Sequence, residues 1–450
     1  RKKMQPKLLE ARDLFPDQQA AVETIMEFVE DPSASEMLVE GPAGSGKTSS
    51  IRVSINELPK AYRSGVVVCA PTNKAVKVAR ELSGGLVDTT TIYKLLSLSP
   101  QANGEVKEIR QGENAHQKLM ATELVYLDEA SMNGSVLKPF IRRAQEDYGI
   151  KFVYIADRYQ LPPVGEDLSW VFREVRSRVV LDKVKRHDNQ ILNLATHLRE
   201  VIDGNAKLKV ADDFTEEHGG IELFTRSKAF DERILDTWEA TRREAGDAEP
   251  DFSGSRVLAW RNQAVGGYND LVREMLYGRR EARDNPLMVG ERVVVCNPVL
   301  SLQEDNVTLM HTDEEGFIEK ISIRPHPKYP EIECFALVVL RESNGEPCGV
   351  FTPTPAGQKV VERMLRNFKQ KAEREDRVFW GAFWRLKELM NDVRPCHALT
   401  THRSQGSTFR ETFINLDDIL ANRNSIEALK SAYVAVTRAS HKANIKWGGF

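Results

Sequence analysis

The octapeptide Gly41-Pro-Ala-Gly-Ser-Gly-Lys-Thr48 constrains the fold more than any other part of this sequence. It matches the phosphate-loop pattern G-x-x-x-x-G-K-[ST], and the flanks Met37–Val39 and Ser49–Ile55 predict the strand before it and the helix after it. In such a unit, glycines let backbone N–H groups turn toward phosphate, and the helix N-terminus adds a positive partial charge. We expect Lys47 to reach the terminal phosphates and Thr48 to ligate Mg²⁺. The residues predicted to bind nucleotide here are Gly41, Pro42, Ala43, Gly44, Ser45, Gly46, Lys47, Thr48 and Ser49.

The composition limits the class of protein. With 450 residues, of which 41% are hydrophobic, the chain can bury large cores and is long enough for more than one domain. Five cysteines lie far apart without a C-x-x-C pair, which argues against a zinc site or a disulfide framework and favours reduced thiols. No apolar stretch is long enough to span a bilayer, and the N-terminus lacks the apolar core of a secretion signal. We therefore expect a cytoplasmic protein without a membrane partner. The net charge of −3 does not indicate nucleic acid, so any such role must rest on local features.

Short apolar runs alternate with helical patterns along much of the chain. In the first part, the runs predict parallel strands buried on both faces, and the alternation predicts a doubly wound α/β domain. A second set of runs predicts a second α/β domain. The strands expected in the first part are Met37–Val39, Val66–Ala70, Leu124–Leu127 and Phe152–Ile155, with helices over Thr72–Leu82 and Val136–Glu146. Those expected in the second are Val257–Trp260, Arg292–Cys296 and Thr412–Leu416, with Tyr433–Val436 as either a strand or the start of a helix.

Two segments interrupt this alternation. Residues Ser97–Thr122 are polar and contain Asn103-Gly104, a strong hairpin-turn signal, so we expect a small inserted hairpin, with a disordered loop as the alternative. Residues Val299–Pro395 begin with short β-like runs that suit a small β-barrel, and continue with helical spacing over Ala356–Val393. The β-like runs are Gly316–Ile323, Cys334–Leu340 and Cys348–Phe351.

Side chains suited to phosphate hydrolysis follow the predicted strands. One apolar strand ends in Asp128-Glu129, so Asp128 can hold Mg²⁺ and Glu129 can orient and deprotonate the attacking water. Gln160 comes after the next strand, where it can bond the γ-phosphate or the water in line with it. Arg186 and Arg438 are candidates for stabilising the transition state, although each in isolation resembles a surface arginine. The predicted catalytic residues are Lys47, Glu129, Gln160, Arg186 and Arg438, and the predicted metal ligands are Thr48 and Asp128.

Gln18 lies ahead of the phosphate loop, in the segment Leu14–Ala20. Its amide can both donate to and accept from the edge of an adenine, so we include it among the nucleotide-binding residues. An ordinary glutamine at the start of a helix is the alternative, and the sequence alone favours it.

Taken in order, these segments resemble the motifs of superfamily 1 helicases, most closely the RecD-like superfamily 1B group and its phage members. Two positions depart from the pattern, since Ala156 stands where a glycine is usual and Phe15 where a threonine is usual. Neither change removes a side chain that does chemistry. The matching segments are Gln18, Gly41–Thr48, Ala70–Ala75, Thr89–Tyr93, Leu127–Met132, Asp157–Gly165, Val184–Arg186, Leu399–Thr408 and Tyr433–Ala439.

The resemblance implies two RecA-like P-loop NTPase domains with ATP in the cleft between them. Lys47, Thr48, Asp128, Glu129 and Gln160 would come from the first domain, and Arg438 would reach across from the second. The implied first domain comprises residues 1–96 and 123–190, the strand-splitting pin residues 97–122, the second domain residues 191–298 and 396–450, and the barrel with its helical extension residues 299–395.

The resemblance further implies an ATP- and Mg²⁺-dependent translocase that travels 5′→3′ on single-stranded DNA and unwinds forks. It implies action as a monomer, replication or single-strand-binding proteins as possible partners, and the host cytoplasm as location for a phage protein. Two alternatives stay open. One is an RNA helicase of the same superfamily, and the other is a DNA-stimulated ATPase that acts as a recombination mediator without unwinding.

The resemblance also supplies candidate DNA contacts, mostly hydroxyl and amide side chains, which bind phosphate without a large net charge. Tyr93 is a candidate stacking platform for a base, with a buried core tyrosine as an equal alternative. The hairpin segment has no Phe, Tyr or Trp, so strand splitting would rely on Ile109 or on the backbone. The cluster Trp380–Trp384 can pack the helical piece or brace the hairpin, and packing is the favoured interpretation. The candidate DNA contacts are Pro71, Thr72, Asn73, Thr91, Tyr93, His402, Ser404 and Thr408.

Overall fold

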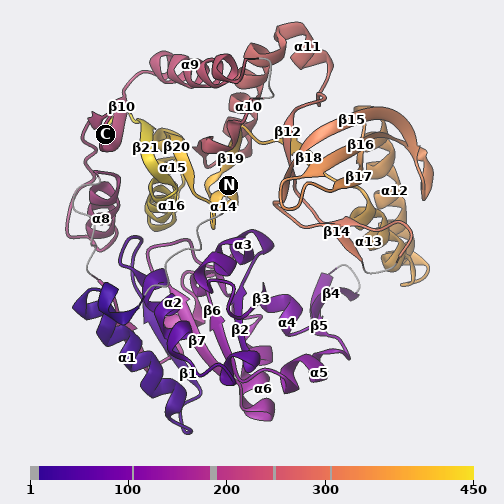
Figure 1. Ribbon diagram of the computed structural model, residues 1–450. Helices are drawn as coiled ribbons and strands as arrows, with labels where there is room; N and C mark the ends of the chain where they lie inside the picture. The colour runs from indigo at the N-terminus through magenta and orange to yellow at the C-terminus, as the bar shows by residue number, and fades with distance from the viewer. Residues whose placement is uncertain (1–9, 104–105, 183–189, 247–249, 305–306, 450) are drawn as a thin grey trace.

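The computed structural model describes residues 10–103, 106–182, 190–246, 250–304 and 307–449 (Figure 1). The first domain is built on a six-stranded parallel sheet of order β3-β2-β6-β7-β1-β8. Its strands are β1 Glu36–Glu40, β2 Val66–Ala70, β3 Asp88–Thr91, β6 Leu124–Leu127, β7 Lys151–Ala156 and β8 Arg178–Val180. Its main helices are α1 Pro16–Glu30, α2 Lys47–Glu57, α3 Asn73–Leu82 and α6 Lys138–Tyr148.

Helices cover both faces of this sheet because its strands are apolar on both sides. On β1, Met37 and Val39 pack with α1 and α2, whereas Leu38 between them packs with Ile141 of α6. This period of two is what a doubly covered strand requires. The doubly wound α/β fold predicted from the sequence is therefore confirmed for this part of the chain.

The second domain has its own six-stranded sheet, of order β19-β11-β20-β21-β10-β9, in which only β9 runs antiparallel to its neighbour. Residues Tyr433–Val436, which the sequence left open as strand or helix, lie in the buried helix α16. The strands are β9 Asp213–Thr215, β10 Gly219–Phe224, β11 Ser255–Ala259, β19 Ala398–Thr400, β20 Phe409–Asn415 and β21 Ala439–Lys446. The main helices are α8 Gln190–Ile202, α9 Ser227–Ala245, α10 Asn262–Tyr277, α11 Arg279–Asp284 and α16 Ser425–Thr437.

One strand prediction was wrong. The run Arg292–Cys296, expected in the second parallel sheet, forms β12 (Arg292–Val295) in a separate five-stranded antiparallel sheet of order β17-β16-β15-β12-β18. An apolar run that is buried on every side looks the same in either sheet, so the sequence could not place it. The inserted barrel thus includes residues before the expected boundary at Val299.

The barrel strands wrap around a common core in Figure 1, and the predicted β-like runs are among them. A helical extension follows, as expected, with α12 Pro355–Arg374 and α13 Phe379–Leu389. The remaining strands are β13 Val299–Leu300, β14 Thr308–Met310, β15 Glu315–His326, β16 Tyr329–Arg341, β17 Pro347–Pro353 and β18 Val393–Pro395.

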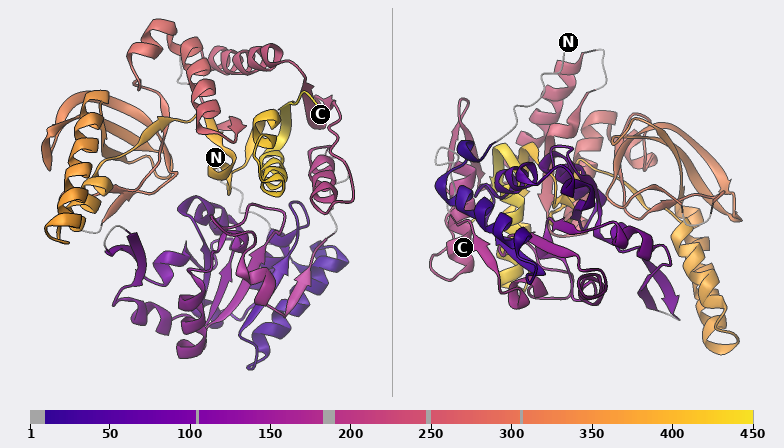
Figure 2. Two further views of the ribbon diagram at one scale, coloured as in Figure 1. Left: turned by 180° about the vertical axis from the view of Figure 1, so that it is seen from behind. Right: turned by 60° about the horizontal axis from the view of Figure 1, so that its bottom comes forward.

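The predicted hairpin is present as β4 Leu98–Asn103 and β5 Val106–Gln111, paired antiparallel with Asn103 opposite Val106. Helix α5 (Ala115–Met120) returns the chain to β6. Helix α13 lies beside β4, and Figures 1 and 2 both show the helical extension next to the hairpin. Ile109 packs against the core of the first domain, so its side chain is not offered as a wedge.

Buried ion pairs attach the barrel to the second domain. Glu315 of β15 accepts hydrogen bonds from Arg256 of β11 and from Nε of Arg292, the latter at 2.9 Å, and Arg292 also donates to Glu342 at 2.6 Å. Arg256, Arg292 and Glu315 are all buried. Removing one partner of such a network would leave a buried charge unpaired, so these contacts hold the barrel against the second domain.

None of the helices in the described part of the chain combines the length and apolar character that crossing a bilayer requires.

His397, between β18 and β19, gives the second domain a pH-dependent stability. Its Nδ1 accepts a hydrogen bond of 3.1 Å from Nε1 of Trp238, and burial, aided by nearby arginines, lowers the pKa of His397 to about 3. Unfolding restores an ordinary pKa near 6.5. Below about pH 6.5 the unfolded state therefore takes up a proton that the folded state refuses, and stability falls as the pH falls.

We expect the unfolding free energy from urea titration to decrease by about 1.4 kcal/mol per pH unit between about pH 6 and pH 4 because of this histidine. His397→Asn keeps an acceptor near Trp238 but cannot be protonated, so its stability should depend less on pH. Equal slopes for the two proteins would contradict this assignment.

Candidate nucleotide-binding cleft

The phosphate loop lies between β1 and α2, as the motif predicts. Gly44 and Gly46 have φ angles of +79° and +88°, a backbone region that side-chain-bearing residues rarely enter. A Cβ on Gly46 would also lie 1.8 Å from Nε2 of Gln18, so a side chain at this position would displace Gln18. The Lys47 ammonium group donates to the carbonyls of Gly41 and Pro42, the latter at 2.9 Å, and so lies along the loop.

Asp128 and Glu129 follow β6 at the same edge of the sheet. Oδ1 of Asp128 accepts a hydrogen bond of 2.8 Å from the backbone N–H of Glu129, and Glu129 has a left-handed φ of +51°. A non-glycine residue held in this conformation is strained, and such strain is common at functional sites. Burial, with the neighbouring Asp128 charge, raises the pKa of Glu129 to about 7, and burial raises the pKa of Asp128. The two carboxylates are therefore suited to a site in which a bound cation supplies positive charge beside them.

A cleft of about 780 Å³ brings the predicted site residues together. Residues from both domains line it, which the sequence could anticipate only through the family resemblance. From the first domain come Gln18, Lys47, Thr48, Asp128, Glu129 and Gln160, and from the second come Gly406, Thr408 and Arg438.

Arg438 follows the last residue of α16 and is one of the residues that line this cleft. It is buried, and its guanidinium donates to the carbonyls of Ser407 at 3.1 Å and Val434 at 3.2 Å. Burial lowers the pKa of Arg438, and the charge of Glu129 opposes that shift. The arginine is therefore held within electrostatic reach of the predicted general base. Arg186, the other arginine candidate, lies outside the described residues.

The two glutamines take different places. Gln18 accepts from the N–H of Phe15 at 3.1 Å and donates to the carbonyl of Ser45 at 3.2 Å, so its amide ties α1 to the phosphate loop. Its oxygen is thus engaged, and adenine recognition by Gln18 stays a prediction that relies on its remaining N–H. Gln160 lines the cleft, and its Oε1 is buried without a hydrogen-bond partner among the described residues, as a group awaiting substrate or water would be.

The donor set fits a nucleotide with Mg²⁺. The Thr48 hydroxyl and the Asp128 carboxylate line one cleft, and hard oxygen ligands of this kind are those that Mg²⁺ prefers. The orphaned amide oxygen of Gln160 and the ammonium group of Lys47 lie in the same cleft. The predicted metal ligands and phosphate-binding groups are therefore grouped as their chemistry requires.

The candidate DNA contacts are less uniform. Pro71 and Thr72 are half-buried after β2, the Thr72 hydroxyl accepts from the N–H of Ala75 at 3.2 Å, and His402 on α14 (Thr401–Ser404) is exposed. Asn73 begins α3. Thr91 is buried and its Oγ1 accepts from the N–H of Lys94 at 3.1 Å.

The structure bears on three more of these residues. Ser404 is fully buried and its hydroxyl donates to the carbonyl of Thr401 at 2.7 Å, so it is turned away from any phosphate. Thr408 is exposed and also lines the nucleotide cleft, so its contact with DNA stays a prediction. Tyr93 is half-buried against the first domain's core, which favours the core alternative over a stacking platform.

The expected DNA-binding segments of the two domains nevertheless meet. A Cβ placed on Gly406, just beyond α14, would lie 3.5 Å from Cβ of Ala75 in α3. The segments after β2 and after β19 therefore adjoin across the cleft.

Tyr433 was missed as a functional residue. Its hydroxyl, on α16 of the second domain, donates to Oδ2 of Asp157 at 2.7 Å and accepts from the N–H of Ala43 at 2.9 Å. The available signal was a polar-tipped tyrosine within an otherwise aliphatic buried run, five residues before Arg438.

Comparisons with known proteins agree with this geometry. Residues 13–226 match the family described as AAA domain, and residues 395–445 match the UvrD-like helicase C-terminal domain. An uncharacterised protein of Acanthamoeba polyphaga mimivirus is 24% identical over 94% of this chain and 98% of its own length. The ATP-dependent DNA helicase Dda of Enterobacteria phage T4 is 23% identical over 95% of this chain and 98% of its own length. The two family matches and these relatives support the assignment of the chain to the superfamily 1B helicases.

A solved Pif1 helicase structure shows the same fold as this helicase. It covers 97% of this chain and 92% of the Pif1 chain, with a TM-score of 0.54 at 16% identity. The expected fold class, two RecA-like domains with inserted elements, is thereby confirmed.

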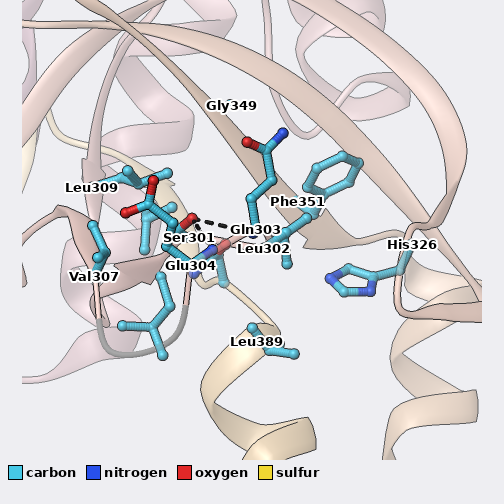
Figure 3. A pocket seen from close by; sticks show the side chains of 13 residues that line it. Ser301, Leu302, Gln303, Glu304, Val307, Leu309, His326, Gly349, Phe351 and Leu389 are labelled. Carbon is cyan, nitrogen blue, oxygen red and sulfur yellow. Dashed lines mark hydrogen bonds between the residues drawn. The ribbon is translucent and has the colours of Figure 1, made fainter.

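A second cavity, of about 360 Å³, lies in the barrel of the helicase (Figure 3). Apolar side chains such as Leu309, Phe351 and Leu389 line it together with His326. None of its lining residues belongs to the nucleotide cleft, so it plays no part in the site described above.

The phosphate loop can be tested at Gly46. We expect Gly46→Ala to lower ADP affinity at least tenfold, since the new Cβ must displace Gln18 and strain the loop. Isothermal titration calorimetry measures this loss.

Gly278→Ala is a matched control, because Gly278 has a similar φ of +85° but open space around its missing Cβ. It should cost about 1–2 kcal/mol of stability and leave ADP affinity unchanged. Equal losses of affinity in both variants would show that general destabilisation, not the loop geometry, is responsible.

Proposed function

We propose that this protein is an ATP- and Mg²⁺-dependent DNA helicase that moves along single-stranded DNA and separates the strands of a fork. The single observation that carries the proposal is the cleft lined by Lys47 and Glu129 of the first domain and Arg438 of the second. Because groups from both domains are needed, hydrolysis requires the domains to be closed on ATP, and release of the products allows the domains to separate. Such alternation converts hydrolysis into movement when the two domains grip DNA in turn.

The residues of the cleft have distinct roles in the proposed hydrolysis. Backbone N–H groups of the phosphate loop and Lys47 hold the β- and γ-phosphates of the substrate, and Thr48 and Asp128 would hold the metal. The metal, when bound, neutralises charge between these phosphates. Glu129 accepts the proton of the attacking water, Gln160 orients that water, and Arg438 stabilises charge that develops on the transferred phosphoryl group.

DNA is proposed as the track on three grounds. Dda, which matches over nearly the full length, is an ATP-dependent DNA helicase, and the Pif1 helicases of the matching structure unwind forked DNA. The segments after β2 and β19 adjoin across the cleft, which offers a path over both domains. The hairpin β4–β5 projects from the first domain beside α13, where a duplex arriving along that path would be split.

We further propose 5′→3′ travel and action as a monomer. The direction is carried over from the family resemblance. The monomer is proposed because one chain supplies the phosphate loop, the general base and the arginine of the cleft.

Fork substrates test the proposal directly. We expect ATP-dependent strand separation of a fork with a 5′ single-stranded tail and little with a 3′ tail, measured by fluorescence of a labelled strand. Stimulation of ATP hydrolysis by poly-dT should exceed that by poly-U. Strong hydrolysis without separation of either fork would favour the non-unwinding ATPase, and stronger stimulation by poly-U would favour an RNA helicase.

Arg438→Ala should lower the kcat for ATP hydrolysis by about 10³-fold while ADP affinity changes little, because the arginine stabilises charge that appears only in the transition state. Steady-state kinetics and calorimetry separate the two quantities. Arg423→Ala, at an exposed position before α16, is a matched control that should leave kcat unchanged. A normal kcat in Arg438→Ala would remove the second domain from the chemistry.

Glu129→Gln should bind ATP but hydrolyse it at least 10²-fold more slowly, since the amide cannot accept the proton of the attacking water. A filter-binding assay with ATP and a phosphate-release assay check the two parts. Undiminished turnover would overturn the role of Glu129.

A further inference from the structure

Tyr433 joins three elements that otherwise belong to different parts of the molecule. It lies on α16 of the second domain, is 1% exposed, and reaches into the first domain. Its hydroxyl donates to Oδ2 of Asp157 at 2.7 Å and accepts from the N–H of Ala43 at 2.9 Å. Ala43 belongs to the phosphate loop, and Asp157 follows β7. One oxygen atom thus connects α16 with the phosphate loop and with the end of β7.

The Asp157 carboxylate is fixed independently of Tyr433. It is 2% exposed, and its Oδ1 accepts from the N–H of Tyr159 at 3.0 Å. Burial and the Asp157 charge raise the pKa of Tyr433 well above its ordinary value, so the hydroxyl stays protonated and donates a hydrogen bond to Asp157. The lone pair that faces Ala43 is then an acceptor for a phosphate-loop N–H, a group of the kind that binds nucleotide phosphates.

A second contact crosses the same interface. The Tyr159 hydroxyl, from the first domain, donates to Asp203 just beyond α8 at 2.8 Å, and the rings of Tyr159 and Tyr433 lie 6.1 Å apart. Tyr159 and Ala43 both pack against the core of the second domain. The interface next to the phosphate loop is therefore specific and polar, and is not a chance contact of two surfaces.

We propose that Tyr433 is a positioning residue that couples the conformation of the phosphate loop to the placement of Arg438. The proposal rests on the proposed function. Tyr433 and Arg438 lie five residues apart, one within α16 and one at its end, so a helix moving as a rigid rod carries both. When the Ala43 N–H moves, the Tyr433 side chain moves with it, and α16 carries Arg438 along. Without the Tyr433 hydroxyl, the position of Arg438 no longer follows the position of the phosphate loop.

The bland alternative is that Tyr433 merely fills space between the domains. Its ring would then matter and its hydroxyl would not. Tyr433→Phe keeps the ring and removes only the two hydrogen bonds, so it separates the two interpretations.

The first readout is hydrogen exchange of the Ala43 amide in the nucleotide-free protein, followed by mass spectrometry of the phosphate-loop peptide. We expect exchange about fivefold to tenfold faster in Tyr433→Phe, because the amide loses its acceptor. The second readout is steady-state kinetics with oligo-dT. We expect kcat to fall about tenfold with little change in KM for ATP, the sign of lost transition-state placement.

Tyr268→Phe is the matched control. The Tyr268 hydroxyl accepts a hydrogen bond of 2.9 Å from Asn415, and both residues lie in the second domain. This variant also loses one tyrosine hydroxyl but keeps the contact between the domains, so it should change neither Ala43 exchange nor kcat.

The outcomes separate this inference from the proposed function. Unchanged Ala43 exchange in Tyr433→Phe would show that the contact does not hold the loop, and faster exchange with unchanged kcat would show that it does not place Arg438. Either result overturns the coupling. If the wild-type protein hydrolysed no ATP with any nucleic acid, the proposed function would fail, while the exchange experiment would still report on the contact.

Discussion

Helix α16 packs against the phosphate loop, and the rest of the active cleft depends on that contact. Lys47, Asp128, Glu129 and Arg438 line one cleft, and the charges of Glu129 and Arg438 stabilise each other across the two domains. Charges fixed in this way are well placed to stabilise charge that develops during reaction, because little reorganisation is needed. The same arrangement makes the chemistry sensitive to the separation of the domains, which is the property that a motor requires.

The remaining elements transmit this separation outward. The barrel is attached to the second domain by the buried Arg256–Glu315–Arg292 network, and Arg403 of α14 donates to Asp313 of the barrel at 2.7 Å. The hairpin belongs to the first domain. Its neighbour Lys94 meets His311 of the barrel at 3.3 Å, and α13 lies beside β4. Any opening of the cleft therefore changes the contact between hairpin and barrel, so the hairpin and the nucleotide site respond to the same movement.

Local features of this protein could be predicted from the sequence, and distant pairings could not. The phosphate loop, the hairpin and the carboxylates after β6 are encoded by a few neighbouring residues, which fix backbone conformation directly. The strand Arg292–Val295 was misplaced because burial on all sides does not reveal the pairing partner. Ser404 was expected to contact DNA but is buried, and of the two alternatives for Tyr93 the packing favours the core residue. Tyr433 was missed because its partners are 276 and 390 residues away in the chain.

The most direct test of the two-domain cleft is a crystal structure with ADP–aluminium fluoride and oligo-dT bound. We expect the Lys47 ammonium group and the Arg438 guanidinium both to lie within hydrogen-bond distance of the fluoride, with Glu129 facing the attacking water. A structure in which the domains are closed on the nucleotide while Arg438 still bonds Ser407, Val434 and Thr437, and not the fluoride, would contradict this arrangement.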